Sequence, residues 1–265
     1  MTYDEICICL KKAGIENYST EARILIEEFC PPFSFDKSYD SEKLNSAIRR
    51  RCERYPLQYI IGKWWFARCE FEVSEDCLVP RPDTELIVEL ACKLLPENAA
   101  FADLCTGSGC IAVSVLDMRK DTLADAYELY PKTLAIAERN AEKNGVMARF
   151  TPVLADVLDE DALGNVKYSA IISNPPYIRS KVIDTLEPEV KKEPRAALDG
   201  GCDGLVFYRS IVKNFSRNLE EDGFFLFEIG YDQGADIKKI ADDFGFACEV
   251  KKDLGGCDRA AILRR

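Results

Sequence analysis

The sequence predicts an α/β fold with a mostly parallel sheet, an antiparallel last strand and a small helical domain at the N-terminus. Beyond residue 96, short apolar runs alternate with stretches of helical periodicity, which is typical of parallel strands joined by right-handed crossover helices. The first 56 residues show helical periodicity alone. The last two apolar runs are separated only by a short turn containing Gly255 and Gly256, so they are expected to pair antiparallel.

Three segments follow from this pattern. Residues 1–56 are expected to form the helical domain, and residues 81–265 the main α/β domain. Residues 57–80, between them, are rich in aromatic and β-branched side chains, which predicts a hairpin-like connector. The helical stretches of the first segment are residues 5–13, 19–29 and 41–54.

Within the main domain, helices and strands are expected to alternate. Pro131 in the first turn and Gly145 just past the end support a helix between them. The expected helices are residues 83–95, 111–118, 131–143, 205–219 and 233–244. The expected strands are residues 101–104, 123–129, 150–155, 168–173, 223–229, 247–252 and 259–263.

Composition excludes several classes of function. The net charge of -11 argues against direct binding to nucleic acid, because that affinity rests largely on Lys and Arg neutralising phosphates. The sequence lacks both a signal-like start and a run of about 18 apolar residues, so a cytoplasmic protein without membrane contact is expected. The chain has no histidine, which excludes Ser-His and Cys-His nucleophile pairs. Its 12 cysteines show no zinc-site spacing, and no metal is expected.

A glycine-containing loop follows the first strand of the main domain. In open α/β sheets the ligand crevice lies at the carboxyl ends of the strands, and glycines there allow close approach of the backbone to a ligand. The loop lacks the GxGxxG spacing of a dinucleotide site and the lysine of a P-loop. The loop residues expected to contact a ligand are Cys105, Thr106, Gly107, Ser108 and Gly109.

Acidic residues occur at the ends of the next two strands. Glu128 lies about 20 residues after the loop, where a carboxylate normally accepts the hydroxyls of a ribose. Asp156, followed by Val157, ends the third strand and is placed to accept from an adenine amino group. Each acid alone is typical of a solvated loop. Together they outline a pocket for an adenosine-bearing ligand, and S-adenosyl-L-methionine fits better than a nucleotide polyphosphate.

The fourth strand runs directly into Asn174, Pro175, Pro176 and Tyr177. Two prolines make this exit stiff, because each fixes φ and neither donates an N–H. The Asn174 side-chain oxygen and the Pro175 carbonyl are therefore two acceptors suited to the two hydrogens of an NH2 group, with Tyr177 as an aromatic wall. A proline-rich surface loop would also accommodate the same four residues.

With these residues in place, the sequence resembles the Rossmann-like, class I S-adenosylmethionine-dependent methyltransferases that modify amide or exocyclic amine nitrogen. Longer blocks resemble the peptide-chain release factor glutamine N5-methyltransferases, the HemK-type family, over nearly the whole chain. These blocks are residues 56–62, 78–85, 193–201, 227–230 and 252–256.

The resemblance implies an activity in translation termination. The expected acceptor is the glutamine of the Gly-Gly-Gln loop in class 1 release factors of the bacterial type, and the expected by-product is S-adenosyl-L-homocysteine. Asn174, Pro175 and Tyr177 are the implied catalytic residues, and Pro176 joins them in binding the substrate. Asn174 also borders the methyl donor.

Two positions depart from the family's usual pattern. Cys105 stands where glycine is usual, and its Cβ is tolerated only if φ there is negative. Glu128 stands where aspartate is commoner.

Several expectations stay open at the level of sequence. The charged segment 179–203 has the composition of a mobile lid or of a solvated loop. Arg81 and Glu85 either pair with each other or line the substrate entrance. The alternatives to a release factor methyltransferase are a nucleic-acid amine methyltransferase, which would need a basic surface, and a non-catalytic S-adenosylmethionine-binding protein, which would more readily have lost Asn174 or Glu128.

Overall fold

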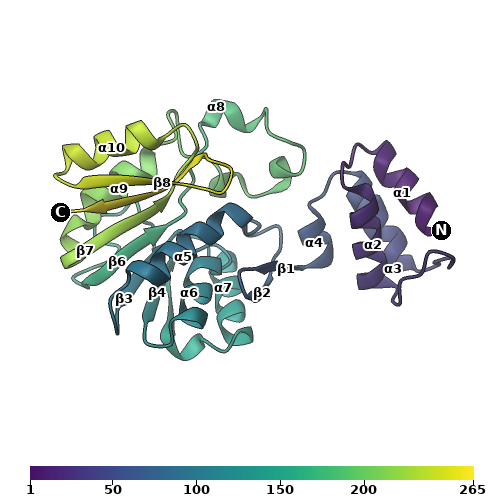
Figure 1. The fold of residues 1–265 in the computed structure, drawn as a ribbon, viewed down its shortest axis with the longest axis horizontal. Coiled ribbons are helices and arrows are strands. Elements are labelled where there is room, and N and C mark those ends of the chain that lie inside the picture. Colours follow the sequence, from purple (N-terminus) through teal and green to yellow (C-terminus); the bar gives the residue numbers. More distant parts are fainter.

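The computed structural model describes all residues, 1–265, and Figure 1 shows a small helical bundle beside a larger α/β domain. The bundle's interior is a separate cluster of 13 buried apolar residues, among them Leu10, Leu25 and Leu44. Its first helix begins with a capping box, in which Thr2 and Glu5 each accept from the other's backbone N–H. The bundle helices are α1 (Tyr3–Lys12), α2 (Tyr18–Phe29) and α3 (Glu42–Cys52).

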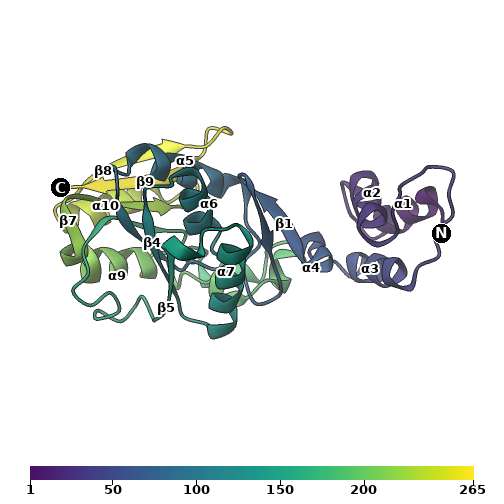
Figure 2. The same ribbon diagram turned by 90° about the horizontal axis from the view of Figure 1, so that it is seen from below.

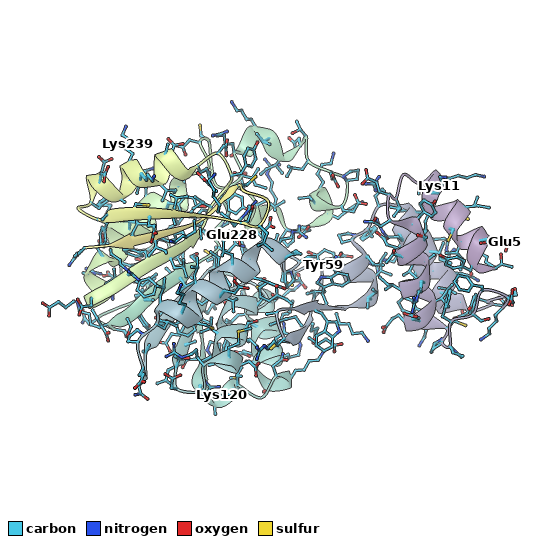
Figure 3. The ribbon with its side chains drawn as sticks, viewed as in Figure 1. Glu5, Lys11, Tyr59, Lys120, Glu228 and Lys239 are labelled. Carbon is cyan, nitrogen blue, oxygen red and sulfur yellow. The ribbon has the colours of Figure 1, made fainter.

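The connector begins with a helix, so the expectation of extended structure from residue 57 is wrong for its first turn. Helix α4 (Leu57–Ile61) ends at Gly62, whose left-handed φ of 78° stops it. Its side chains serve two interiors, because Leu57 and Ile60 pack in the bundle while Tyr59 packs in the main domain. Tyr59 lies where the two bodies face each other (Figure 3). A helical turn allows these side chains to pack into both interiors, and this packing outweighs the β propensity of the residues.

The hairpin expected in the connector is present. Strands β1 (Lys63–Phe66) and β2 (Cys69–Glu72) pair antiparallel. Phe66 and Phe71 are buried in the core of the main domain, so the hairpin belongs physically to that domain.

The main sheet has seven strands in the order β5-β4-β3-β6-β7-β9-β8. All neighbours up to β7 pair parallel, whereas β9 is antiparallel to both β7 and β8. The mostly parallel sheet with an antiparallel end is thereby confirmed. The strands are β3 (Ala100–Leu104), β4 (Leu123–Glu128), β5 (Phe150–Leu154), β6 (Tyr168–Ser173), β7 (Leu219–Glu228), β8 (Ala247–Lys252) and β9 (Asp258–Arg264).

Helices cover both faces of this sheet. One face packs against α5, α6 and α7 through residues such as Ile87, Val113 and Ile136. The other face packs against α9 and α10, for example through Ile211 and Ile237. Figure 2 shows the sheet between α5 and α9. The helices are α5 (Glu85–Leu94), α6 (Cys110–Met118), α7 (Pro131–Lys143), α9 (Val206–Phe215) and α10 (Gly234–Asp243).

One expected boundary is wrong. Helix α9 stops at Phe215, a 3-10 turn follows, and β7 already begins at Leu219, four residues earlier than expected. Leu219 is buried and pairs with Tyr168 of β6. No helix combines the length and the apolar composition that a membrane-spanning segment requires.

The segment between β6 and α9 connects the bundle to the main domain. It contains α8 (Ser180–Ile183), and the chain after α8 reaches toward α4 and the bundle (Figure 1). Glu189 of this segment accepts hydrogen bonds from Arg51 and Arg54 at 2.6 to 2.9 Å. Glu193 binds the Arg81 side chain and accepts from Val79 N.

The pairing of Arg81 with Glu85, one of two sequence-based possibilities, is therefore not formed. Glu85 instead accepts from the backbone N–H of Ala67. The lid expected at 179–203 stays a prediction.

We expect Glu189→Gln to lower the free energy of unfolding by about 1–3 kcal/mol, because Arg51 is buried and loses a charged partner. Glu187→Gln is the matched control, since Glu187 lies in the same turn but is exposed and forms no ion pair. Urea denaturation of both variants measures the difference. Equal stability of the two would show that the bridge contributes nothing.

Candidate active site

The carboxyl ends of β3, β4 and β6 meet at one edge of the sheet. Strand β3 pairs with β4 on one side and β6 on the other, so the loops after these strands start side by side. The direction of winding reverses between β3 and β6, and ligands bind at such switch points in open α/β sheets.

A cavity of about 250 Å³ lies at this edge, and we call it the strand-end cavity. Its wall combines loop ends of the sheet with residues 194–199 from the connecting segment. Thr106, Ser108 and Gly109 do not line it; they shape the loop behind it. The predicted residues that do line the cavity are Cys105, Gly107, Glu128, Asp156, Val157, Asn174 and Pro176.

The loop after β3 alternates between left-handed and ordinary backbone. Cys105, Gly107 and Gly109 have φ values of 58°, 59° and 79°. The expectation of a negative φ at Cys105 is therefore wrong, and this cysteine holds a conformation that costs a residue with a Cβ about 1–2 kcal/mol. The surrounding bonds impose it, because Thr106 N donates to Tyr127 O and Gly107 N donates to Glu128 Oε2.

Glu128 joins this loop to the end of β4. Its Oε1 accepts from the backbone N–H groups of Leu129 and Tyr130, and its Oε2 accepts from Gly107 N at 3.1 Å. Only Oε2 therefore keeps free lone-pair capacity toward the cavity. Glu128 is 8% exposed, and burial raises the pKa of its carboxyl group against the effect of these N–H donors. Asp156 is an exposed cavity residue whose Oδ1 accepts from Leu158 N.

Asp103 lies beneath the loop and lines neither cavity, and sequence reasoning overlooked it. It is the fourth residue of the buried strand β3, where its acidic side chain interrupts an apolar run, and that interruption was the available signal. Its Oδ2 accepts from Thr106 Oγ1 and Ala112 N, whereas its buried Oδ1 has no partner. Burial raises its pKa to about 7. An unpartnered buried acceptor beneath the loop fits a cationic or N–H-bearing ligand group.

Asn174 separates the strand-end cavity from a second one. This second cavity, of about 230 Å³, we call the Glu228 cavity, and Asn174 lines both. Tyr177 lines the Glu228 cavity, so the structure places Asn174 and Tyr177 on the wall of one cavity. Pro175 lines neither cavity, and no N–H of the chain donates to its carbonyl.

A glycine turn holds the backbone after Asn174 in place. Ile178 N donates to Leu198 O, and Gly200 N donates to Ile178 O, both at 2.9 Å. A Cβ on Gly200 would lie 2.7 Å from the Pro176 carbonyl oxygen, a distance that only glycine allows. The segment 193–201 therefore packs directly on the Asn-Pro-Pro-Tyr turn, which explains why these two blocks occur together.

Comparisons with known proteins agree with this architecture. A family model described as "Methyltransferase small domain" matches residues 83–214. A release factor glutamine methyltransferase of Geobacter sulfurreducens is 38% identical, covering 94% of this chain and 90% of that protein. One from Caulobacter vibrioides is 37% identical, covering 96% of this chain and 91% of that protein.

Solved structures show the likeness of fold. A methyltransferase from Pyrococcus furiosus superposes with a TM-score of 0.55 at 16% identity, covering 74% of this chain and 88% of that chain. The human Mettl16 catalytic domain in complex with a MAT2A 3′UTR hairpin gives 0.59 at 14% identity, with 84% and 82% covered. The Rossmann-like, class I methyltransferase fold is thereby confirmed.

We expect Cys105→Gly to be more stable than Cys105→Ala by about 1 kcal/mol. Both variants lose the sulfur, and only alanine keeps a Cβ at a left-handed φ. Urea denaturation of the two variants measures this difference. The opposite order, with alanine more stable, would place Cys105 at a negative φ.

We expect stability to fall as pH rises from about 4 to 7, with Asp103 contributing up to about 1.4 kcal/mol per pH unit. Because the pKa of Asp103 is raised, the folded chain binds more protons than the unfolded chain in this window. The stability that the protonated carboxyl contributes is therefore lost as the pH rises toward 7. Asp103→Asn should flatten this slope, and the exposed Asp222→Asn should not. An unchanged slope in Asp103→Asn would contradict the assignment. Urea denaturation across the pH range provides the measurement.

Proposed function

The chain belongs to the release factor glutamine methyltransferases, and we propose that it methylates the side-chain amide nitrogen of a release-factor glutamine with S-adenosylmethionine as donor. The observation that carries this proposal is the position of Asn174. It lines the strand-end cavity and the Glu228 cavity at once, so a donor in one and an amide in the other would meet beside it.

The chemistry of the strand-end cavity fits S-adenosylmethionine. Glu128 Oε2 and Asp156 are acceptors for the hydroxyls and amino group of adenosine, and Val157 supplies an apolar contact. Acidic groups on this wall favour a positively charged ligand. The donor supplies an activated methyl group, and S-adenosyl-L-homocysteine remains after transfer.

The Glu228 cavity fits a carboxamide. Asn174 Nδ2 donates to Thr84, which leaves Asn174 Oδ1 as an acceptor, and the Pro175 carbonyl has no donor within the chain. We propose that these two oxygens, of which only the one on Asn174 belongs to a residue lining the cavity, accept the two hydrogens of the substrate NH2, with Tyr177 beside the amide plane.

Orientation is the main contribution expected of these residues. An amide nitrogen is a weak nucleophile because its lone pair is delocalised into the carbonyl. Two acceptors that hold its hydrogens orient the nitrogen and stabilise the positive charge that develops on it. Transfer first gives a positively charged nitrogen that carries the new methyl group and both hydrogens. This cation is strongly acidic and loses one of the two protons to water, so no histidine is needed.

The expected protein substrate is a class 1, bacterial-type release factor, at the glutamine of its Gly-Gly-Gln loop, which places the enzyme in translation termination in the cytoplasm. We propose that the bundle 1–56 contacts the body of the release factor and that the main domain 81–265 carries the chemistry. The relatives' names support this substrate, and the net charge of -11 disfavours a nucleic-acid substrate.

We expect one methyl group on the Gly-Gly-Gln glutamine when the chain is incubated with purified release factor and labelled S-adenosylmethionine, as read by mass spectrometry of the peptides. Nucleic acid incubated in parallel should take up no label. Label in the nucleic acid but not in the release factor would overturn the proposed substrate.

Asn174→Ala should lower the rate of transfer by about 100-fold or more, because the amide loses one of its two acceptors. Affinity for the methyl donor should change little, and equilibrium dialysis with S-adenosyl-L-homocysteine measures it. A variant that transfers at the wild-type rate would remove Asn174 from the mechanism.

A further inference from the structure

The segments 78–85 and 227–230 meet beside Asn174 through Thr84 and Glu228. Thr84 ends the 3-10 turn Pro82–Thr84 that leads into α5, and Glu228 ends β7. Thr84 Oγ1 donates to Glu228 Oε2 at 2.6 Å. Both residues are 1% exposed, and Figure 3 labels Glu228 near the middle of the main domain.

Asn174 and Tyr177 are both attached to this buried pair. Asn174 Nδ2 donates to Thr84 Oγ1 at 3.3 Å, and the Tyr177 hydroxyl donates to Glu228 Oε1 at 3.2 Å. The two side chains that border the acceptor amide are therefore connected, through Thr84 and Glu228, to a single carboxylate. Glu228 also lines the cavity in which they lie.

The direction of each hydrogen bond follows from the chemistry of the carboxylate. An ionised carboxylate only accepts, so the single proton of the Thr84 hydroxyl goes to Glu228. The remaining lone pairs of Thr84 can then only accept, and they select the NH2 end of the Asn174 amide. The oxygen of Asn174 is consequently the end left for the substrate.

Two hydroxyl donors reach the carboxyl group of Glu228, one on each oxygen: Thr84 at 2.6 Å and Tyr177 at 3.2 Å, the arrangement of an accepting carboxylate. Burial raises the pKa of Glu228, and these hydroxyls and the positive charge of Arg259 on β9 offset only part of that rise.

We propose that Thr84 and Glu228 are positioning residues, which fix the Asn174 amide with its oxygen toward the substrate glutamine. This inference rests on the proposed function. Without the Thr84 hydroxyl, the Asn174 amide is free to turn over and present N–H groups to the N–H groups of the substrate. The consequence is a loss of orientation in the transition state, with the donor site unaffected.

The test compares Thr84→Val, which removes the hydroxyl at nearly constant volume, with Thr84→Ser, which keeps it. We expect Thr84→Val to lower kcat by about 30-fold to 100-fold and Thr84→Ser by less than about threefold. The dissociation constant of S-adenosyl-L-homocysteine should stay within about twofold in both variants. Thr122→Val is the matched control, because Thr122 is equally buried and its hydroxyl binds only the Arg119 carbonyl.

A structural role alone would give a different result. If Thr84→Val keeps kcat within twofold of wild type, or if Thr84→Ser falls as far as Thr84→Val, the positioning role is wrong. A loss of kcat in Thr122→Val equal to that in Thr84→Val would also overturn it, because any buried threonine would then have the same effect.

A second measurement requires neither catalysis nor a folded valine variant. In the 15N-labelled wild-type chain, the Asn174 side-chain NH2 should show slow hydrogen exchange with water, and the same resonance should stay protected in Thr84→Ser. Rapid exchange in the folded wild type would overturn the proposal even if Thr84→Val fails to fold. If the wild type leaves release factor unmethylated while the Asn174 amide is protected, the proposed function fails and the hydrogen-bonded arrangement stands.

Discussion

The parallel pairing of β3 with β4 on one side and β6 on the other is the constraint on which the rest of the site depends. It places the ends of three strands at one edge, so that Cys105, Glu128 and Asn174 leave the sheet within reach of the same cavity. No local interaction in the chain could bring these residues together, because they are separated by long crossover connections. The antiparallel strand β9 then contributes Arg259 beside Glu228, which lies at the end of β7.

Three buried carboxylates surround this edge, and each is held by donors from its own neighbourhood. Asp103, Glu128 and Glu228 accept from N–H or O–H groups of the loops that they position, and burial raises the pKa of each. Burying such groups costs stability, and the donors recover only part of that cost. The left-handed Cys105 adds backbone strain at the same place. The buried carboxylates and the left-handed Cys105 therefore lower the free energy of unfolding in the part of the molecule that shapes the two cavities. Such strain is common at functional sites.

The segment 186–199 contacts both the helical bundle and the two cavities of the main domain. Leu186, Val190 and Leu198 line the Glu228 cavity, and Pro194, Ala196 and Asp199 line the strand-end cavity. Between them, Glu189 binds the arginines of the bundle. A change in the orientation of the bundle therefore acts on the same short segment that closes both cavities. This physical connection is what a lid ordered by substrate binding would use, and Gly200 limits its freedom by packing on the Asn-Pro-Pro-Tyr turn.

The elements with strong local signals could be predicted from the sequence: the alternation of strands and helices, the three bundle helices, the antiparallel end of the sheet, and the positions of the loop, acidic and Asn-Pro-Pro-Tyr residues after the strands. Periodicity, prolines and glycines act over a few residues, so they can be read from a chain. The helical turn at 57–61, the φ of Cys105, the partner of Arg81 and the contact of Thr84 with Glu228 could not be predicted from the sequence. Each of these depends on atoms more than ten residues away, whose hydrogen bonds and packing outweigh local preference, and a linear pattern carries no information about which distant group will be the neighbour.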